Sequence, residues 1–388
     1  MKTMKMPIAK SQRGFSLIEL LIASTVGLVV ILALTMMFRQ ALNATFVVTQ
    51  RAETQQNLRA GMELMMKDLS MAGAGLPSGG LQLATAGGAT KVACNQTGTC
   101  YVPADTYPNT NFMYGILPGF GNGVQNGVAI TAAPAATNDS ITSIYCDYNF
   151  PLTNFKFTFP STTQATVAVV NGAVTPNNIL APGGLNVGDL ILFLIATPGT
   201  GTGSEGTSSA LTATAVGEIT GIPNNTEILF AAGDELNFNQ PAAATNSLAN
   251  AITTLGGALG AGNQVTACRL NAVTYFLQVP PAGGTVQTPR LMRQVNGLTA
   301  IPVADNVINL QFSYDVINSV AGTISPNQSN PLGAGLSPAL IQKVNIWIMG
   351  QGLIVSGDKA QSMYLASSIS TRNMSFCNSY SANTTVCQ

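Results

Sequence analysis

Residues 15–38 form a continuous apolar segment that contains a single charged residue, Glu19. About 20 apolar residues are enough for a helix to cross the hydrocarbon core of a membrane, so this segment predicts a spanning helix. A carboxylate costs a few kcal/mol near the centre of such a helix and less near its end. Glu19 is therefore a candidate functional group whose partner has to be identified.

The residues before this segment are basic, and the four cations are Lys2, Lys5, Lys10 and Arg13. They predict that this end stays in the cytoplasm and that the rest of the chain crosses the membrane. A secretory signal peptide has an apolar core of about 7 to 15 residues, which is shorter than residues 15–38. The simplest alternative is an ordinary single-span anchor in which Glu19 lies near the lipid headgroups.

Gly14 and Phe15 after a basic leader, Glu19 at the fifth position after Gly14, and the long apolar run together resemble the N-terminal motif of type IV prepilins. The resemblance implies that a prepilin peptidase cleaves between Gly14 and Phe15 and that the new amino group of Phe15 is methylated. Residues 1–14 would be a leader peptide, and the helix of residues 15–38 would move from the lipid into a filament core. There Glu19 would pair with the Phe15 amino group of a neighbouring subunit, because opposite charges attract strongly where water is excluded.

The helical pattern continues through residues 39–72, which contain no Pro and a single Gly. Four apolar side chains recur at helical spacing: Leu58, Met62, Met65 and Leu69. Six charged residues are expected on or beside the opposite face: Arg51, Glu53, Arg59, Glu63, Lys67 and Asp68. Gly73, Gly75 and Pro77 then favour an end, so one helix is expected from residue 15 to about residue 71. We expect the apolar stripe to pack on a globular domain rather than on a separate partner.

Residues 73–388 predict a β-rich head domain, and the predicted fold class is α+β. Short β-prone segments alternate with Gly, Pro, Asn and Thr clusters, and the first expected strands are residues 140–146, 155–159, 166–170, 189–196 and 213–219. The small-residue segments 197–209 and 242–262 predict mobile loops, with a short helix over residues 248–259 as the alternative for part of the second. Within residues 189–196 the run after Asp189 is continuously apolar, which indicates a central strand packed on both faces, and we expect this strand to lie against the long helix. Residues 307–316 alternate between polar and apolar side chains, as in an antiparallel sheet with one wet face.

Three segments of the second half, residues 272–277, 289–294 and 303–316, resemble the strand series of the PilW group of minor pilins, which is related to the J-type pseudopilins of type II secretion. Residues 344–349 and 367–373 resemble the two closing strands of that group. The resemblance implies a pilin-like fold in which an antiparallel sheet with long loops surrounds the second half of the long helix. It leaves residues 76–265 largely uncovered.

Six cysteines follow the membrane segment, namely Cys94, Cys100, Cys146, Cys268, Cys377 and Cys387. An oxidising periplasm lets disulfides persist, and six cysteines allow fifteen pairings. Short loops favour Cys94 with Cys100 and Cys377 with Cys387, which leaves Cys146 and Cys268 for each other. Metal ligation is the alternative, but the chain has no His and no CxxC spacing.

Other functions receive little support from the residues. Without His there is no Ser-His-Asp or Cys-His arrangement, and the adjacent acids Asp234 and Glu235 are expected to be solvated. After residue 73 there are 8 Lys or Arg against 12 Asp or Glu, so nucleic acid binding is not predicted. The acids near Asp139 and Asp147 are too scattered for a calcium loop. We predict no catalysis, cofactor, metal or small-molecule substrate.

The sequence therefore predicts a minor pilin that primes or caps a type IV pilus. The expected partners are the prepilin peptidase, other minor pilins, the major pilin and the inner membrane. The expected location is the inner membrane with a periplasmic head, then the pilus or cell surface after assembly. A J-type pseudopilin of type II secretion is the alternative within the class. An adhesion module that binds through loops between Leu76 and Val265 is the alternative from another class.

Overall fold

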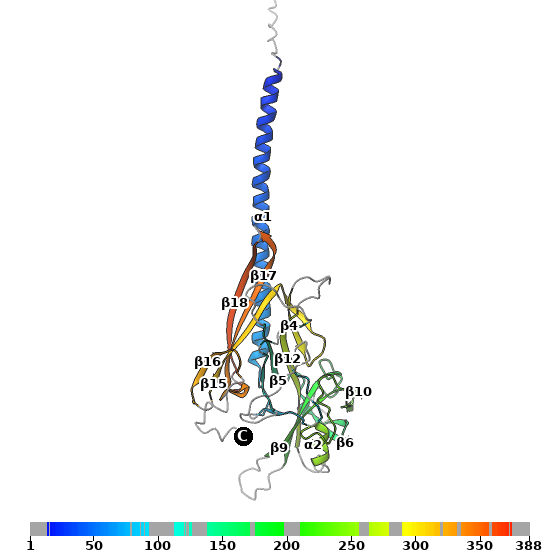
Figure 1. Cartoon of the computed structure of the whole chain (residues 1–388). Coiled ribbons are helices and arrows are strands. Elements are labelled where there is room, and N and C mark those ends of the chain that lie inside the picture. Colours follow the sequence, from blue (N-terminus) through cyan, green and yellow to red (C-terminus); the bar gives the residue numbers. More distant parts are fainter. Residues whose placement is uncertain are drawn as a thin grey trace, which may run out of the picture.

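The computed structural model describes residues 14, 16–77, 80–85, 87–88, 90–92, 112–119, 121, 124–125, 138–170, 175–197, 210–255, 264–278, 289–318, 321–331, 335–356, 359–371 and 373–374. A single long helix projects from a β-rich head (Figure 1). The expected α+β, pilin-like architecture is confirmed.

Helix α1 spans Leu17–Ser70 and contains 54 residues. Its end has a clear local cause, because Gly73 and Gly75 adopt φ angles of +82° and +72°, which side chains with a Cβ rarely tolerate. The Gly73 N–H donates to the Ile144 carbonyl, so the chain leaves the helix along a strand of the head. The predicted helix from residue 15 to about residue 71 is confirmed over its described length.

The described strands form four sheets. The two-stranded sheet contains β1 (Leu81–Gln82) and β2 (Phe112–Met113). A four-stranded sheet has the order β10 (Gly221–Asn224), β11 (Glu227–Leu229), β7 (Gln164–Val169) and β6 (Phe155–Ser161). The eight-stranded sheet contains β3 (Ile116–Gly119), β4 (Val124–Gln125), β5 (Ser140–Asp147), β8 (Leu190–Thr197), β9 (Ala210–Glu218), β12 (Gln264–Gln278), β13 (Arg290–Val295) and β14 (Ile301–Asp305). The last sheet has the order β16 (Ile324–Gln328), β15 (Val307–Ile317), β17 (Ile341–Ser356) and β18 (Lys359–Ser370).

Strand β12 is the backbone of the largest sheet, because it pairs in turn with β8, β5 and β13. The named strand pairs are antiparallel, as expected, except for the short parallel pair of β4 and β12. Helix α2 (Leu248–Leu255) forms within residues 242–262, so the loop prediction is wrong for this part and the helical alternative for residues 248–259 is the correct one. The described residues also contain the 3-10 helices η1 (Leu152–Asn154) and η3 (Pro338–Leu340).

The second half of α1 is covered by β14, β17 and β18. The four side chains of the predicted stripe are at most 3% exposed, so packing of this stripe against the head is confirmed. The helix and the head approach each other closely at two glycines. A Cβ added at Gly61 of α1 would lie 3.0 Å from Leu291, and one added at Gly350 of β17 would lie 3.0 Å from Thr54.

The prediction for residues 189–196 was half wrong. Strand β8 is central and buried, since Leu190 to Phe193 are fully covered. However, it does not lie against α1. Its side chains enter two other apolar clusters, one shared with β6 and β7 and one with β5 and β12, whereas the apolar residues of α1 belong to a third cluster. The continuous apolar run predicted that β8 is buried on both faces, but it did not show which elements cover the strand.

The alternation predicted for residues 307–316 holds from Leu310 onward. Before that point a register shift in the pairing with β17 turns the strand, so Val307 and Asn309 are buried and Ile308 is partly exposed. A β-bulge places two residues opposite one and so reverses the faces. This bulge explains why Val307 interrupts the polar row in the sequence.

Candidate functional site

The tip of α1 carries the residues of the predicted processing site. Gly14 is exposed, and no atom lies within 4 Å of the position that a Cβ would occupy. Phe15 lies outside the described residues. Ser16 has extended backbone angles (φ −72°, ψ 140°) and is the N-cap of α1. Its N–H donates to the Glu19 carboxylate at 3.0 Å, so Glu19 satisfies a backbone donor at the positive end of the helix dipole.

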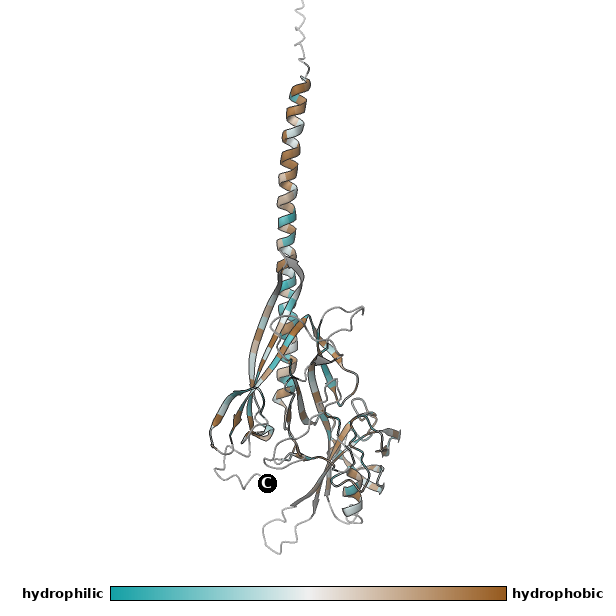
Figure 2. Ribbon diagram, in the orientation of Figure 1, coloured by the Kyte–Doolittle hydropathy of each residue, from teal (hydrophilic) through white to brown (hydrophobic). Residues whose placement is uncertain are grey.

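The free part of α1 exposes its apolar side chains on all sides. Every Leu, Ile, Val, Met and Phe from Leu17 to Phe38 is at least 50% exposed. Figure 2 shows the hydrophobic colouring of this part of the helix. Soluble monomers rarely expose apolar patches larger than a few hundred Å². A helix that is apolar all round requires lipid or other helices as neighbours.

The length of this free segment is sufficient for a membrane span. Every residue of α1 from Leu28 to Phe46 is exposed and Val47 is partly buried, so the helix projects about 45 Å from Leu17 before the head begins to cover it, at 1.5 Å per residue. The hydrocarbon core is about 30 Å thick. Within the described part of the chain, α1 is the helix whose length and composition allow it to cross a membrane.

The head holds the other end of α1 through a buried carboxylate, that of Asp68. Asp68 is 2% exposed, and one of its oxygens lies 2.7 Å from Arg293 Nε on β13 and 2.6 Å from the Tyr275 hydroxyl on β12. The other oxygen accepts the Tyr145 hydroxyl of β5 at 3.2 Å. The Asp68 backbone carbonyl accepts the Ser143 hydroxyl at 2.9 Å. This Asp68 cluster, defined as Asp68, Tyr145, Tyr275 and Arg293, joins the helix to three strands.

The protonation of the cluster follows from its burial and charges. Burial, followed by the negative charge of Asp68, raises the pKa of Tyr145 to about 12. Burial and the hydrogen bond to Asp68 also raise the pKa of Tyr275. Burial disfavours the charged form of Arg293, but the hydrogen bond and charge of Asp68 outweigh this and raise the pKa of the guanidinium. Both tyrosines therefore donate as neutral hydroxyls, and Arg293 is the cation of a buried ion pair.

The sequence prediction for Asp68 was wrong, because it was expected on or beside the charged face of α1. Asp68 follows Met65 by three residues and Gly61 by seven, so it lies on the buried face. That spacing was a usable signal: a charged residue within an apolar helical stripe needs a buried partner. The identity of the partner was not readable, because Arg293 lies 225 positions away in the chain.

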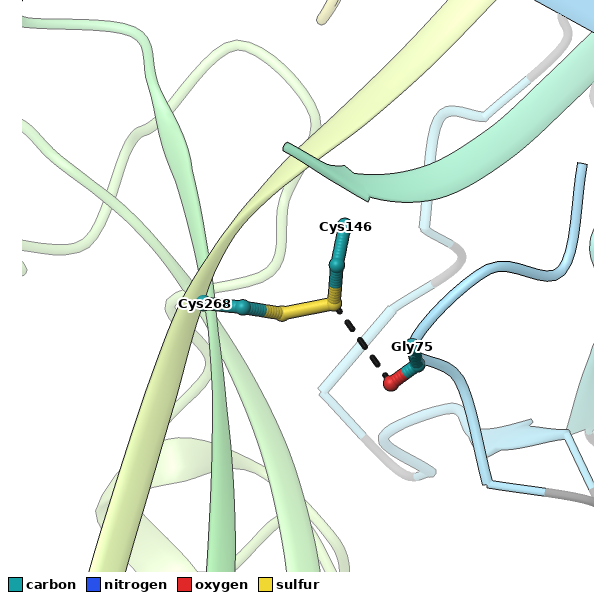
Figure 3. The surroundings of a disulfide bond; sticks show 3 residues. All are labelled: Gly75, Cys146 and Cys268. Carbon is teal, nitrogen blue, oxygen red and sulfur yellow. Dashed lines mark hydrogen bonds between the residues drawn. A yellow bond between two sulfur atoms is a disulfide. The ribbon is translucent and has the colours of Figure 1, made fainter. Parts of the chain in front are cut away.

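The structure joins Cys146 of β5 to Cys268 of β12 in a disulfide, which is the pair that the short-loop preference leaves for each other (Figure 3). The Cys146 sulfur contacts the Gly75 carbonyl oxygen at 3.5 Å, so the bridge lies beside the segment that leaves α1. A cross-link over 122 positions contributes up to about 5 kcal/mol in the chain-entropy account. Cys94, Cys100, Cys377 and Cys387 lie outside the described residues.

A second buried acidic group surrounds Glu218 at the end of β9. Glu218 is 4% exposed and accepts the Leu236 N–H at 2.9 Å, and Asp234 is 7% exposed and accepts the Phe238 N–H at 2.6 Å. The expectation that Asp234 is solvated was therefore wrong, because backbone N–H groups replace water as its partners. Burial, opposed by the Leu236 N–H and reinforced by Asp234, raises the pKa of Glu218 to about 7.

This pKa predicts a pH-dependent stability. A raised pKa means that Glu218 binds its proton more tightly in the folded state, so stability decreases as pH rises from the ordinary value of 4.5 to about 7. We expect the melting temperature of the full chain in detergent to fall between about pH 5 and about pH 8. Glu218→Gln should reduce this fall and should melt higher than the native chain at the alkaline end.

The neighbouring Glu235 is exposed, so Glu235→Gln is a matched control that should leave the pH profile unchanged. If Glu218→Gln and the native chain lose the same stability over this range, Glu218 is not the titrating group.

The structure separates the two acids considered for calcium. Asp139 and Asp147 lie at opposite ends of β5, where Asp139 accepts the N–H groups of Gly121 and Phe312 and Asp147 pairs with Arg269. Among the described residues no group of three or more potential metal ligands is present. These acids therefore act as structural acceptors in the described structure.

Comparison with known proteins found a match at the N-terminal end of the chain. A family model described as the prokaryotic N-terminal methylation motif matches residues 9–35. The chain carries a prepilin-type N-terminal methylation motif. This match and the fold support a type IV pilin-like protein that a prepilin peptidase processes, and they are consistent with membrane anchoring. No curated protein and no solved structure matches the chain.

Proposed function

We propose that this pilin-like protein is a minor pilin of the PilW group, which primes the assembly of a type IV pilus or caps its tip. The observation that carries the proposal is the combination of a prepilin motif with a helix that is exposed as far as Phe46, apolar all round from Leu17 to Phe38, and buried in the head from Thr54 onward. Such a helix has the properties of a polymerisation element. The head would then make the contacts that determine which subunits or surfaces this protein binds.

Processing would occur at the exposed tip. In the proposed sequence of events the peptidase cuts between Gly14 and Phe15, the Phe15 amino group is methylated, and the protein waits in the inner membrane with its head in the periplasm. It then joins other minor pilins and the major pilin through α1. The proposal assigns the protein a structural role without catalysis.

Glu19 has the acceptor capacity for the proposed contact between subunits. One oxygen of its carboxylate accepts the Ser16 N–H. A carboxylate has two oxygens and about four lone-pair sites, so a second donor can bind at the same time. The methylated amino group of a neighbouring Phe15 is a cation of suitable size. Water exclusion in a helix bundle would strengthen the attraction.

One end of the head is available for contacts outside the filament core. The sheet of β6, β7, β10 and β11 and helix α2 lie at the end of the head opposite the projecting helix (Figure 1). They form their own apolar cluster with β8 and β9. In a filament whose core is made of N-terminal helices, this end is the part that points away from the core. This arrangement also keeps open the adhesion alternative.

The β8–β9 loop allows a test that separates priming from adhesion. Thr197 of β8 pairs directly with Ala210 of β9, so residues 198–209 can be replaced by Asn-Gly, which closes a two-residue hairpin. In cells lacking the native chain we expect few or no pili. The shortened variant should restore the number of pili if priming is the function.

Attachment of the same cells to a surface gives the second measurement. Normal pili with lost attachment would assign adhesion to the β8–β9 loop. A normal number of pili in cells without any copy of this chain would contradict the priming proposal. A requirement for protein secretion with no effect on pili would favour the pseudopilin alternative.

A further inference from the structure

The outer face of the β16–β15–β17–β18 sheet contains a groove of about 580 Å³. Small-molecule sites usually measure about 300–1,000 Å³. Directly paired residues of antiparallel strands share a face, and the pairs Gln311–Trp347 and Ser313–Asn345 line the groove. The intervening Phe312 and Ile346 belong to the apolar cluster that covers α1. The polar and aromatic side chains therefore project away from the core.

The groove contains the one Trp of the chain, Trp347. Trp347 is only partly buried and belongs to none of the apolar clusters. Tyr364 of β18 is 70% exposed and stacks near it, with ring centroids 6.5 Å apart and planes at 23°. The two rings give the sheet a flat apolar surface that contributes nothing to the core. A surface aromatic pair of this kind is typical of a recognition site.

Amide and hydroxyl groups border the aromatic surface. The Asn345 amide nitrogen donates to Asp315 and to the Asn327 side-chain oxygen, at 3.1 Å each. These bonds fix both amides and leave the Asn345 oxygen and the Asn327 nitrogen for another partner. Gln311 and Ser313 add further groups that can donate and accept. These side chains are therefore held in place to form hydrogen bonds with hydroxyl groups, which can both donate and accept a hydrogen bond.

Charge in the groove is neutralised within the protein. The Asp139 carboxylate accepts the N–H groups of Gly121 and Phe312 at 2.9 and 3.0 Å. At the margin, Lys343 lies 2.6 Å from Asp315. Among the described residues that line the groove, none is an unpaired cation or a solvated acid. A phosphate or a cationic peptide would find no counter-charge here.

We propose that this groove binds a neutral carbohydrate. One face of a pyranose ring presents C–H groups that can stack on Trp347 and Tyr364, and its hydroxyls match the donors and acceptors of Gln311, Asn345 and Asn327. Aromatic stacking and amide hydrogen bonds select a neutral sugar over an ion or a purely apolar ligand. The inference concerns a surface separate from α1 and does not depend on membership of a filament.

Because Trp347 is the one Trp of the chain, its fluorescence reports directly on binding in the groove. The full chain is purified in lauryldimethylamine oxide, a detergent without a sugar headgroup, and screened on an array of immobilised neutral and sialylated oligosaccharides that includes maltotriose and triacetylchitotriose. Each oligosaccharide that binds is then titrated in solution against Trp347 fluorescence. We expect at least one neutral oligosaccharide to bind the array and to change the emission in a saturable manner.

Three variants test the location. Tyr364→Ala and Gln311→Ala should each weaken the fluorescence titration about tenfold, since a tenfold change corresponds to about 1.4 kcal/mol, the size of one stacking or hydrogen-bond contribution. Trp347→Ala should abolish binding on the array. Tyr148→Ala is the matched control, because Tyr148 is a 61% exposed aromatic residue just beyond the far end of β5 and should not affect binding. Thermal melting checks that each variant is folded.

The proposal is wrong if no neutral oligosaccharide binds, or if binding survives all three groove substitutions in folded protein. Binding restricted to sialylated sugars would also contradict it, because the groove lacks a free cation. If Tyr364→Ala instead lowers incorporation into pili while no sugar binds, the face is a protein interface and the carbohydrate assignment fails. The array and fluorescence outcomes do not depend on whether the chain primes pili.

Discussion

Replacing Asp68 with Ala is expected to lower the free energy of unfolding by about 3–5 kcal/mol, the range found when one partner of a buried ion pair is removed. The substitution leaves Arg293 as a charge that is only 20% exposed, and it removes the acceptor of the Tyr275 hydroxyl. Both losses occur where α1 meets the head. Urea unfolding of the full chain in detergent, followed by Trp347 fluorescence, measures the effect.

The neighbouring Lys67 is exposed on the same turn, so Lys67→Ala is the matched control and should change stability by less than about 0.5 kcal/mol. A compensated variant separates charge from packing. Asp68→Leu combined with Arg293→Met, Tyr145→Phe and Tyr275→Phe should recover most of the loss, because apolar replacement of a whole buried pair is often neutral. Equal stability of Asp68→Ala and the native chain would show that the cluster does not hold the helix.

Glu19→Val is expected to leave peptidase cleavage and membrane insertion intact and to reduce incorporation into pili about tenfold or more. Valine is favourable in a membrane helix, so insertion should not suffer. A charge-assisted hydrogen bond contributes about 1.5–3 kcal/mol, which corresponds to at least a tenfold effect on assembly. Immunoblots of sheared pili and of membranes measure incorporation and insertion separately.

Two further variants identify the cause. Glu19→Gln keeps an oxygen that can accept the Ser16 N–H but removes the charge, so it should resemble Glu19→Val if pairing with Phe15 is the function. Ser24→Val removes an exposed polar group from the same helix and should assemble normally. Undiminished incorporation of Glu19→Val would exclude the charge-pairing account.

Much of the fold was readable from the sequence because it rests on local periodicity. The apolar run, the absence of Pro and the glycines at 73 and 75 predicted α1 almost to its ends, and the spacing of Leu58, Met62, Met65 and Leu69 predicted its buried face. The alternation within residues 310–316 predicted which face of β15 is buried in the core. These patterns depend on neighbours within a few positions.

Most of the errors concern contacts between distant parts of the chain. The partners of Asp68, namely Tyr145, Tyr275 and Arg293, come from three separate strands. Asp234 is the exception, because it accepts the nearby N–H groups of Phe238 and Asn239 and is buried by the turn that they form. The apolar residues of β8 showed burial, but several elements could have covered them. Topology, rather than local pattern, decides these contacts.

The groove around Trp347 was also unrecognised. Most of its residues are spread over β15, β16, β17 and β18 and come together only through the strand register. A lone Trp in a strand is usually buried in the core. The position of Trp347 on the outer face of the sheet became evident only from the structure.

The most direct test of the account is the N-terminal residue and mass of the protein isolated from its native membrane. The account predicts a chain that begins at methylated Phe15 and lacks residues 1–14. A chain that retains Met1 to Gly14 in cells with an active prepilin peptidase would contradict it and would leave an ordinary membrane-anchored protein.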